Sequence, residues 1–172
     1  MKLTSANANK LVRKLNEQKE YLIDKERDSY TYVCANGETP VIPDYDYKEV
    51  AAKISDIDAK IVKIKHAINK VNVTETIQVC GENITIDTIL IRMAQLNQLK
   101  AKLDMMRKMS EKTRLNNRGL NGTNPLIEYR YAHFSIGLVS RDYDAVDAEI
   151  TEMQLALDKF NQTFEFDVDV EL

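Results

Sequence analysis

Six basic side chains and two tyrosines are concentrated between positions 107 and 133. Only two Glu accompany the six Lys and Arg, so this stretch has a net charge of +4 (six minus two) in a chain whose total is −3. The planar guanidinium of Arg holds phosphate or carboxylate through two parallel hydrogen bonds, and a tyrosine ring offers a flat face for a base. The pattern indicates a site for a small anionic, nucleotide-like ligand. The candidate ligand-binding residues are Arg107, Arg114, Arg118, Tyr129, Arg130, Tyr131 and His133.

The same stretch also has a purely structural interpretation. Cations near the end of a helix interact favourably with its macrodipole, which accounts for Arg107, Lys108 and Lys112 at the end of a predicted helix. Gly, Asn and Pro are needed merely to turn the chain from a helix into a strand, and Tyr is a common strand residue. Arg118 and Arg130 are the residues that this interpretation explains least well. Both interpretations are open at the level of the sequence.

The chain lacks the residue patterns of common catalytic sites. Of its two histidines, His66 lies outside the apolar stripe of a predicted helix and His133 lies in a predicted strand beside tyrosines. No GxSxG, P-loop, HExxH or glycine-rich dinucleotide turn is present. Cys34 and Cys80 lie in unrelated contexts without metal-ligand spacing, which predicts reduced thiols. We therefore expect no enzyme, no cofactor and no bound metal.

Composition and charge restrict the class of protein. The chain has 172 residues, with few Gly and Pro, no Trp and 30% charged residues, a mixture typical of long surface-charged helices. The acidic balance argues against general nucleic-acid binding. The N-terminus lacks the apolar run of a signal peptide, and the longest strongly apolar run, TILI, is far short of the roughly 20 residues that span a bilayer. A cytoplasmic protein without membrane contact is expected.

Four segments carry the spacing of amphipathic helices. The first begins near Thr4 and the third follows Thr85, whereas the second follows Asp46, which forms a capping-box pattern with Glu49. In the second and fourth segments the apolar residues alternate at intervals of four and three, the heptad spacing of a seam against another helix. The two stripes consist of Val50, Ile54, Ile57, Ile61, Ile64, Ile68 and Val71, and of Val139, Tyr143, Val146, Ile150, Met153, Leu157 and Phe160.

Short β elements are predicted at the helix connections. ETIQV and NITI flank CGE in the pattern of a hairpin, and TYV at 31–33 and LIEYRYAHFSI are strand candidates, the second with the alternation of a half-buried strand. The C-terminal TFEFDVDVEL alternates more strictly, so a docked strand is favoured over a frayed acidic tail because its apolar side is costly to leave in water. The predicted fold is mostly α: an antiparallel four-helix bundle or coiled coil over 1–163 with these β elements, followed by an acidic strand or tail over 164–172.

The order of these features resembles a known family. INKVNVTETIQVCGENITIDTILIRMAQLNQLKAKLDMMRKM combines Ile-Asn-x-x-Asn, a short polar hairpin, Ile-Thr at a cap and a long helix, and IEYRYAHFSI and YDAVDAEITEMQLALDKFNQT follow. To about Thr163 the chain resembles the small bacterial proteins labelled septicolysin, but it has NQT where they end in Asn-Trp-Thr. The resemblance implies a helical fold. The label implies a cytolysin, although the sequence has no membrane-length helix and no basic amphipathic segment for pore formation.

Three functions compete at this level. The leading one is a non-enzymatic, homo-oligomeric protein that captures a small anionic ligand through the cluster at 107–133, as small proteins of bacterial viruses sequester host signalling nucleotides, by analogy only. The second is a structural or protein-interaction scaffold that acts through coiled-coil surfaces. An enzyme with a site assembled from scattered residues, or a pore-forming toxin, is least favoured. The homo-oligomer is predicted because two heptad stripes and a strand-like tail offer more adhesive surface than one chain needs.

Overall fold

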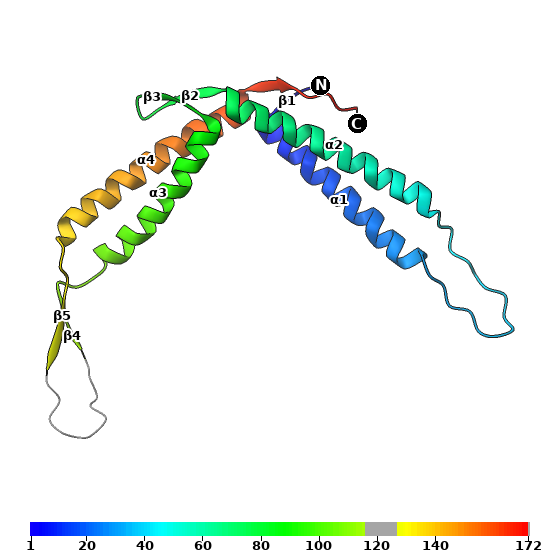
Figure 1. Cartoon of the computed structure of the whole chain (residues 1–172), viewed down its shortest axis with the longest axis horizontal. Helices are drawn as coiled ribbons and strands as arrows, with labels where there is room; N and C mark the ends of the chain where they lie inside the picture. The colour runs from blue at the N-terminus through cyan, green and yellow to red at the C-terminus, as the bar shows by residue number, and fades with distance from the viewer. Residues whose placement is uncertain (116–126, 172) are drawn as a thin grey trace, which may run out of the picture. The chain divides into compact units, whose positions relative to one another are not determined.

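The computed structural model describes residues 1–115 and 127–171. The described residues form four helices and three antiparallel strand pairs, β1–β6, β2–β3 and β4–β5 (Figure 1). The mostly α fold is therefore confirmed. In chain order the elements are β1 Lys2–Thr4, α1 Ser5–Ser29, α2 Tyr47–Thr74, β2 Thr76–Val79, β3 Glu82–Thr85, α3 Ile86–Arg107, β4 Lys112–Leu115, β5 Glu128–Tyr131, α4 Ile136–Thr163 and β6 Glu165–Asp167.

Three of the four helices begin at the residues that the sequence predicts. The Thr4 hydroxyl accepts a hydrogen bond from the backbone N–H of Asn7 (3.2 Å), and the Asp46 carboxylate accepts one from that of Lys48 (2.8 Å). These caps satisfy backbone donors that have no partner inside a helix. Thr85 also occupies the N-cap position of its helix, although it makes no side-chain cap bond.

The chain divides into two compact units. The first consists of Met1–Glu75 with Asp158–Leu172, and the second of Thr76–Leu157. In the first unit α1 packs along α2 (Figure 1), and the buried residues of α2 are Ile57, Ile61, Ile64 and Val71, four members of its predicted stripe. Lys19 of α1 and Asp58 of α2 form an ion pair at 2.7 Å beside this seam.

The first unit also contains the short β1–β6 sheet. Leu3 pairs with Phe166 in its register. On the apolar side of the C-terminal alternation Phe166, Val168 and Val170 are buried, whereas the acids between them are exposed. The last apolar residue of the pattern, Leu172, lies outside the described residues.

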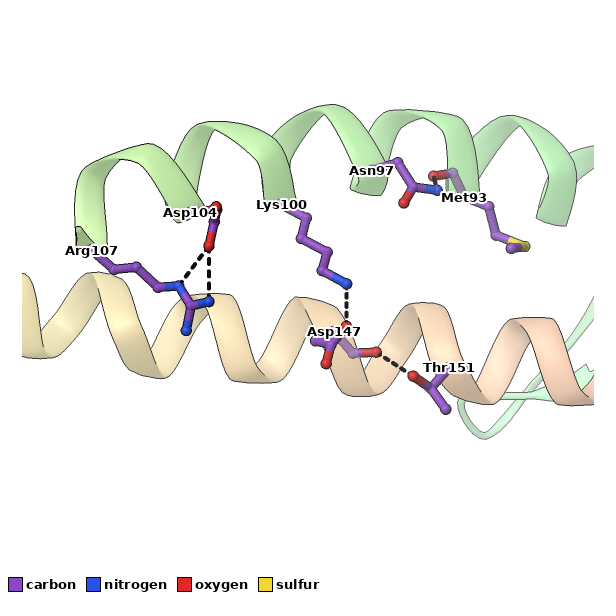
Figure 2. A network of polar contacts seen from close by, with 7 residues as sticks. All are labelled: Met93, Asn97, Lys100, Asp104, Arg107, Asp147 and Thr151. Atoms are coloured by element: carbon purple, nitrogen blue, oxygen red, sulfur yellow. Dashed lines mark hydrogen bonds and ion pairs between the residues drawn. The ribbon is translucent and has the colours of Figure 1, made fainter.

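In the second unit α3 lies beside α4 (Figure 2). Leu103, Val139 and Val146 form the centre of their contact, and partly buried apolar side chains surround them. Ion pairs cross between the helices at the margins, from Lys100 to Asp147 (Figure 2) and from Arg92 to Glu149. An amphipathic stripe of this width can be covered by one neighbouring helix.

A hairpin closes one end of this helix pair. Val79 and Glu82 pair across a two-residue turn in which Cys80 and Gly81 have φ angles of 52° and 80°. Two successive residues with positive φ are the signature of a type I′ turn, whose twist matches the strands. The predicted hairpin around CGE is therefore confirmed, and the Cys80 N–H donates to the carboxylate of Glu152 on α4 (2.6 Å).

One strand prediction was wrong, and a second was wrong only in its burial. Residues 31–33 form neither a strand nor a helix, and no pairing partner lies beside them in the described chain. β5 exists, but all four of its residues are exposed rather than half-buried. The reason is that β5 pairs only with β4 in a two-stranded hairpin that extends beyond the end of α3 and α4 (Figure 1), so no helix covers either face.

The bundle and the oligomer stay predictions. α1 pairs with α2 in one unit and α3 with α4 in the other, so a single four-helix bundle or coiled coil is not confirmed. Every residue of the two heptad stripes is buried or half-buried within the chain. The two stripes are therefore covered within one chain, and a homo-oligomer would have to form through another surface.

We expect Val168→Ala to destabilise the protein because Val168 is only 2% exposed. Removing its two methyl groups from the core should lower the free energy of unfolding by about 1–3 kcal/mol. Val73→Ala is the matched control: Val73 is 60% exposed on α2, so the change should be near neutral. Urea-unfolding curves of the two variants measure the difference, and equal effects would show that the C-terminal segment is not part of the core.

Candidate anion-binding site

The candidate site is built on the β4–β5 hairpin. In its register Lys112 lies opposite Tyr131 and Arg114 lies opposite Tyr129. Residues opposite one another in an antiparallel pair share a face, and neighbours along a strand alternate between faces. Lys112, Arg114, Tyr129 and Tyr131 therefore lie on one face of the hairpin, which we call the tyrosine face. Arg130 lies on the other face, opposite Thr113.

Cation–π contacts organise the tyrosine face. The Lys112 ammonium lies 4.0 Å from the ring centroid of Tyr129 and 5.4 Å from that of Tyr131, and the two centroids are 6.4 Å apart. Such contacts contribute about 0.5–1 kcal/mol at exposed positions. Arg114 shares this face, and its side chain makes no hydrogen bond or ion pair with any described residue. The tyrosine face thus presents two exposed rings, a cation held over them and a second cation without a partner in the described chain.

The other face borders a hollow of about 350 Å³ between the end of α3, the β4–β5 hairpin and the start of α4. Three basic side chains from separate segments line it: Lys108, Arg130 and His133. We call it the basic hollow. Its lining consists of Lys108, Met109, Ser110, Thr113, Arg130, Tyr131, Ala132, His133 and Phe134. A concave apolar surface with a few convergent polar groups is the usual form of a small-molecule site.

Local hydrogen bonds hold the walls of the basic hollow. The Ala132 N–H donates to the Glu111 carbonyl (3.0 Å), which ties the segment after β5 to the segment after α3. Two residues after His133, the hydroxyl of Ser135 accepts from the Leu138 N–H (3.3 Å) and caps α4. α4 therefore begins at one edge of the hollow. The N-terminal end of a helix carries a partial positive charge, which adds to that of the basic side chains.

Arg107 makes a different set of contacts. Its guanidinium lies 3.6 Å from the ring centroid of Tyr143 and donates to the Asp104 carboxylate at 2.8 and 2.9 Å (Figure 2). Lys108 donates to the same carboxylate at 2.5 Å. Hydrogen bonds from Lys108 and then from Arg107 lower the pKa of Asp104, and the bond to Asp104 raises the pKa of Arg107. Arg107 is thus engaged in intramolecular contacts and does not line the basic hollow.

The predicted site residues therefore divide into groups. Arg114, Tyr129 and Tyr131 come together on the tyrosine face, and Arg130, Tyr131 and His133 line the basic hollow. Arg107 belongs to neither group, and Arg118 lies outside the described residues.

Lys108 and Lys112 were missed as site residues because both were assigned to the end of a helix. α3 ends at Arg107, so Lys112 lies in β4 instead. One signal could have identified it: Lys112 and Arg114 alternate with Thr113 and Leu115 in the same two-residue period as Tyr129 and Tyr131.

Comparisons with known proteins find a similar fold but assign the chain to no family. No protein-family model matches the chain, and no curated protein is significantly similar to it. Its fold is similar to that of a functionally unknown conserved protein from Corynebacterium diphtheriae, with a TM-score of 0.61 and 15% sequence identity over 97% of this chain and 100% of that one. At this identity the similarity concerns the fold alone. The resemblance to septicolysin stays a prediction.

Two further observations concern the residues that the structure describes. None of their helices combines the length and the apolar character needed to cross a membrane. No three or more of their His, Cys, Asp and Glu side chains are placed to hold a metal ion together.

The cluster around Asp104 predicts a pH effect on stability. The pKa of Asp104 is lower in the folded protein than in the unfolded chain, where it is about 3.9. The ionised carboxylate therefore stabilises the folded protein at pH values above the unfolded pKa. This stabilisation is lost as the pH falls through the folded pKa. At neutral pH, Asp104→Asn should therefore unfold at a lower urea concentration than the unmodified protein. The difference should shrink as the pH is lowered below about 4. Asp142→Asn, at an exposed position on α4, should show no such pH-dependent difference; if it does, the effect does not come from the Asp104 contacts.

Proposed function

We propose that the protein is a non-enzymatic binding protein that captures a small nucleotide-like anion in the basic hollow. The observation that carries this proposal is the convergence of Lys108, Arg130 and His133 on one hollow that Tyr131 and Phe134 also line. Lys108 directly follows α3, Arg130 lies in β5 and His133 lies between β5 and α4. Two cations, Lys108 and Arg130, and the imidazole of His133 around one concave surface favour an anionic ligand over a purely structural connection.

The chemistry of the lining fits a phosphate attached to an aromatic group. The side chain of Arg130 forms no hydrogen bond or ion pair with another described residue, so its donors are free to bind two phosphate oxygens. Lys108 remains close to Asp104, which leaves the Arg130 guanidinium as the principal phosphate donor. The hydroxyls of Ser110 and Thr113 add neutral donors, and Tyr131 and Phe134 add aromatic residues to the lining.

The lining favours retention of a ligand over its conversion. The described residues around the hollow supply cations, hydroxyls and aromatic rings, and they include no carboxylate or thiol. Acid–base catalysis most often uses a histidine, and the described lining residues provide no carboxylate to orient or activate the imidazole of His133. This chemistry supports sequestration of a nucleotide-like ligand best. Small proteins of bacterial viruses that sequester signalling nucleotides offer an analogy.

A scaffold function is the second candidate, and one feature of the first unit favours it. Tyr21 is 68% exposed on α1 and, with Leu22, borders an open groove of about 590 Å³ that reaches Ile57 of α2. An amphipathic helix of another protein can occupy a groove of this kind. In that case partner binding would depend on Tyr21 and would be insensitive to changes at Arg130.

Arg130→Ala should weaken anion binding. We use ADP-ribose as the probe because it combines a pyrophosphate with an aromatic base, and isothermal titration calorimetry measures its dissociation constant. Hydrogen bonds to charged groups contribute about 1.5–3 kcal/mol each, so the loss should be roughly 10- to 100-fold in affinity.

Arg141→Ala is the matched control because Arg141 is an exposed arginine of α4 that does not line the hollow. It should bind the probe with unchanged affinity. Circular dichroism spectra would confirm that both variants keep their helices. Equal losses of affinity in the two variants would show that the effect comes from the net charge of the protein and not from Arg130 in the hollow. If ADP-ribose, a cyclic dinucleotide and inorganic pyrophosphate all fail to bind the unmodified protein, the proposal is wrong.

A further inference from the structure

The connection between α1 and α2 is long and carries unpartnered apolar side chains. Residues 30–46 form neither helix nor strand, and connections of more than about 12–15 residues without secondary structure are uncommon in compact units. Val33 is fully exposed, Val41 is 89% exposed and Ile42 is 63% exposed. Several neighbouring apolar side chains in water are typical of a surface that binds a partner.

This connection is held in place by its own contacts. The Tyr45 hydroxyl donates to the Glu26 carboxylate on α1 (2.6 Å), and this hydrogen bond raises the pKa of Tyr45 to about 12. The Glu38 N–H donates to the Ala35 carbonyl (3.2 Å) in a turn where Gly37 adopts a φ of 90°. A connection restrained in this way loses less conformational entropy on binding than a free one.

Proline shapes the exposed part of the connection. Pro40 and Pro43 flank Val41 and Ile42 in the order Pro-x-x-Pro. Each proline fixes φ near −65° and restricts the residue before it to extended conformations. Extended segments with this spacing are recognised by surfaces that expose aromatic rings.

The charge of the connection is acidic. Residues 30–46 contain Glu38, Asp44 and Asp46 and no Lys, Arg or His, which gives a net charge of −3. Asp44 directly follows Pro43, so a carboxylate adjoins the exposed apolar pair. A complementary surface therefore needs exposed rings beside cations.

The chain itself provides such a surface, the tyrosine face of the β4–β5 hairpin. Tyr129 and Tyr131 are 41% and 62% exposed there, beside Lys112 and Arg114. The acidic connection and the tyrosine face belong to different units of the chain. They are complementary in charge and in apolar character, which is what a contact between two copies requires.

We propose that residues 39–44 of one copy of the chain dock on the tyrosine face of a second copy. In this contact Val41 and Ile42 lie against the rings of Tyr129 and Tyr131, and the Asp44 carboxylate pairs with Arg114. Because two different surfaces meet, the contact is head-to-tail and builds a ring or an open chain of copies. The contact and the basic hollow share Tyr131, but neither Arg114 nor Asp44 lines the hollow, so reversing these two charges leaves Lys108, Arg130 and His133 in place.

Charge reversal tests the contact in the full-length protein. Sedimentation velocity over a concentration series should show that the unmodified protein self-associates at low salt and dissociates at high salt, because exposed ion pairs are screened. Arg114→Glu and Asp44→Arg should each remain monomeric. An equimolar mixture of the two variants should associate, since each variant then supplies the surface that complements the other.

Arg141→Glu, a reversal at an exposed arginine of α4, is the matched control and should associate like the unmodified protein. The proposal is overturned if the unmodified protein stays monomeric at every concentration. It is also overturned if it associates but Arg114→Glu and Asp44→Arg associate equally well, or if the mixture of the two monomeric variants does not associate. Calorimetry with ADP-ribose on the same variants reports on the basic hollow separately.

Discussion

Both helix pairs depend on the burial of a narrow apolar stripe. Ile57, Ile61 and Ile64 of α2 lie at intervals of four and three and are buried in the first unit, as Val139 and Val146 of α4 are in the second. Because the stripe is narrow, one neighbouring helix covers it. Burying each such side chain contributes about 1.5–3 kcal/mol. The facing apolar side chains of the two helices cover one another along each pair, so little apolar surface remains exposed at the helix–helix contact.

The β4–β5 hairpin brings exposed tyrosine rings and basic side chains together at a helix connection. Lys19–Asp58 and Lys100–Asp147 form ion pairs along the helices, and Arg114 and Arg130 on the β4–β5 hairpin have no polar partner among the described residues. An exposed hairpin has two faces, and alternation gives them different chemistry. One face carries rings and cations on an open surface, and the other borders a hollow. Among the described residues of 107–133, Arg107 is engaged in contacts with Asp104 and Tyr143, whereas Arg114 and Arg130 have no such polar partner.

The features that depend only on neighbouring residues, the helix caps and the tight hairpin, were predicted correctly. Thr4 and Asp46 were identified as helix starts because a cap needs only a short side chain and the next turn of helix, and the hairpin around Cys80 and Gly81 was identified because both strands adjoin its turn. β4 was missed because its pairing partner is separated from it by residues 116–126, and four residues beside a helix end do not show which strand they meet. The two-residue alternation of β5 places Tyr129 and Tyr131 on one face. Whether that face is covered depends on residues far away in the sequence, which is why its exposure was not predicted.

The most direct test of the central claim, that the basic hollow binds an anion, is a chemical-shift titration. Two-dimensional ¹H–¹⁵N spectra of the full chain recorded with increasing ADP-ribose report on every backbone amide and on the Arg130 Nε–H. Binding in the hollow predicts saturable shifts of residues 108–113 and 130–134, including the Arg130 Nε–H, while amides of α1 and α2 stay unchanged. Saturable shifts confined to the α1–α2 groove around Tyr21, or no saturable shifts at all, would contradict it.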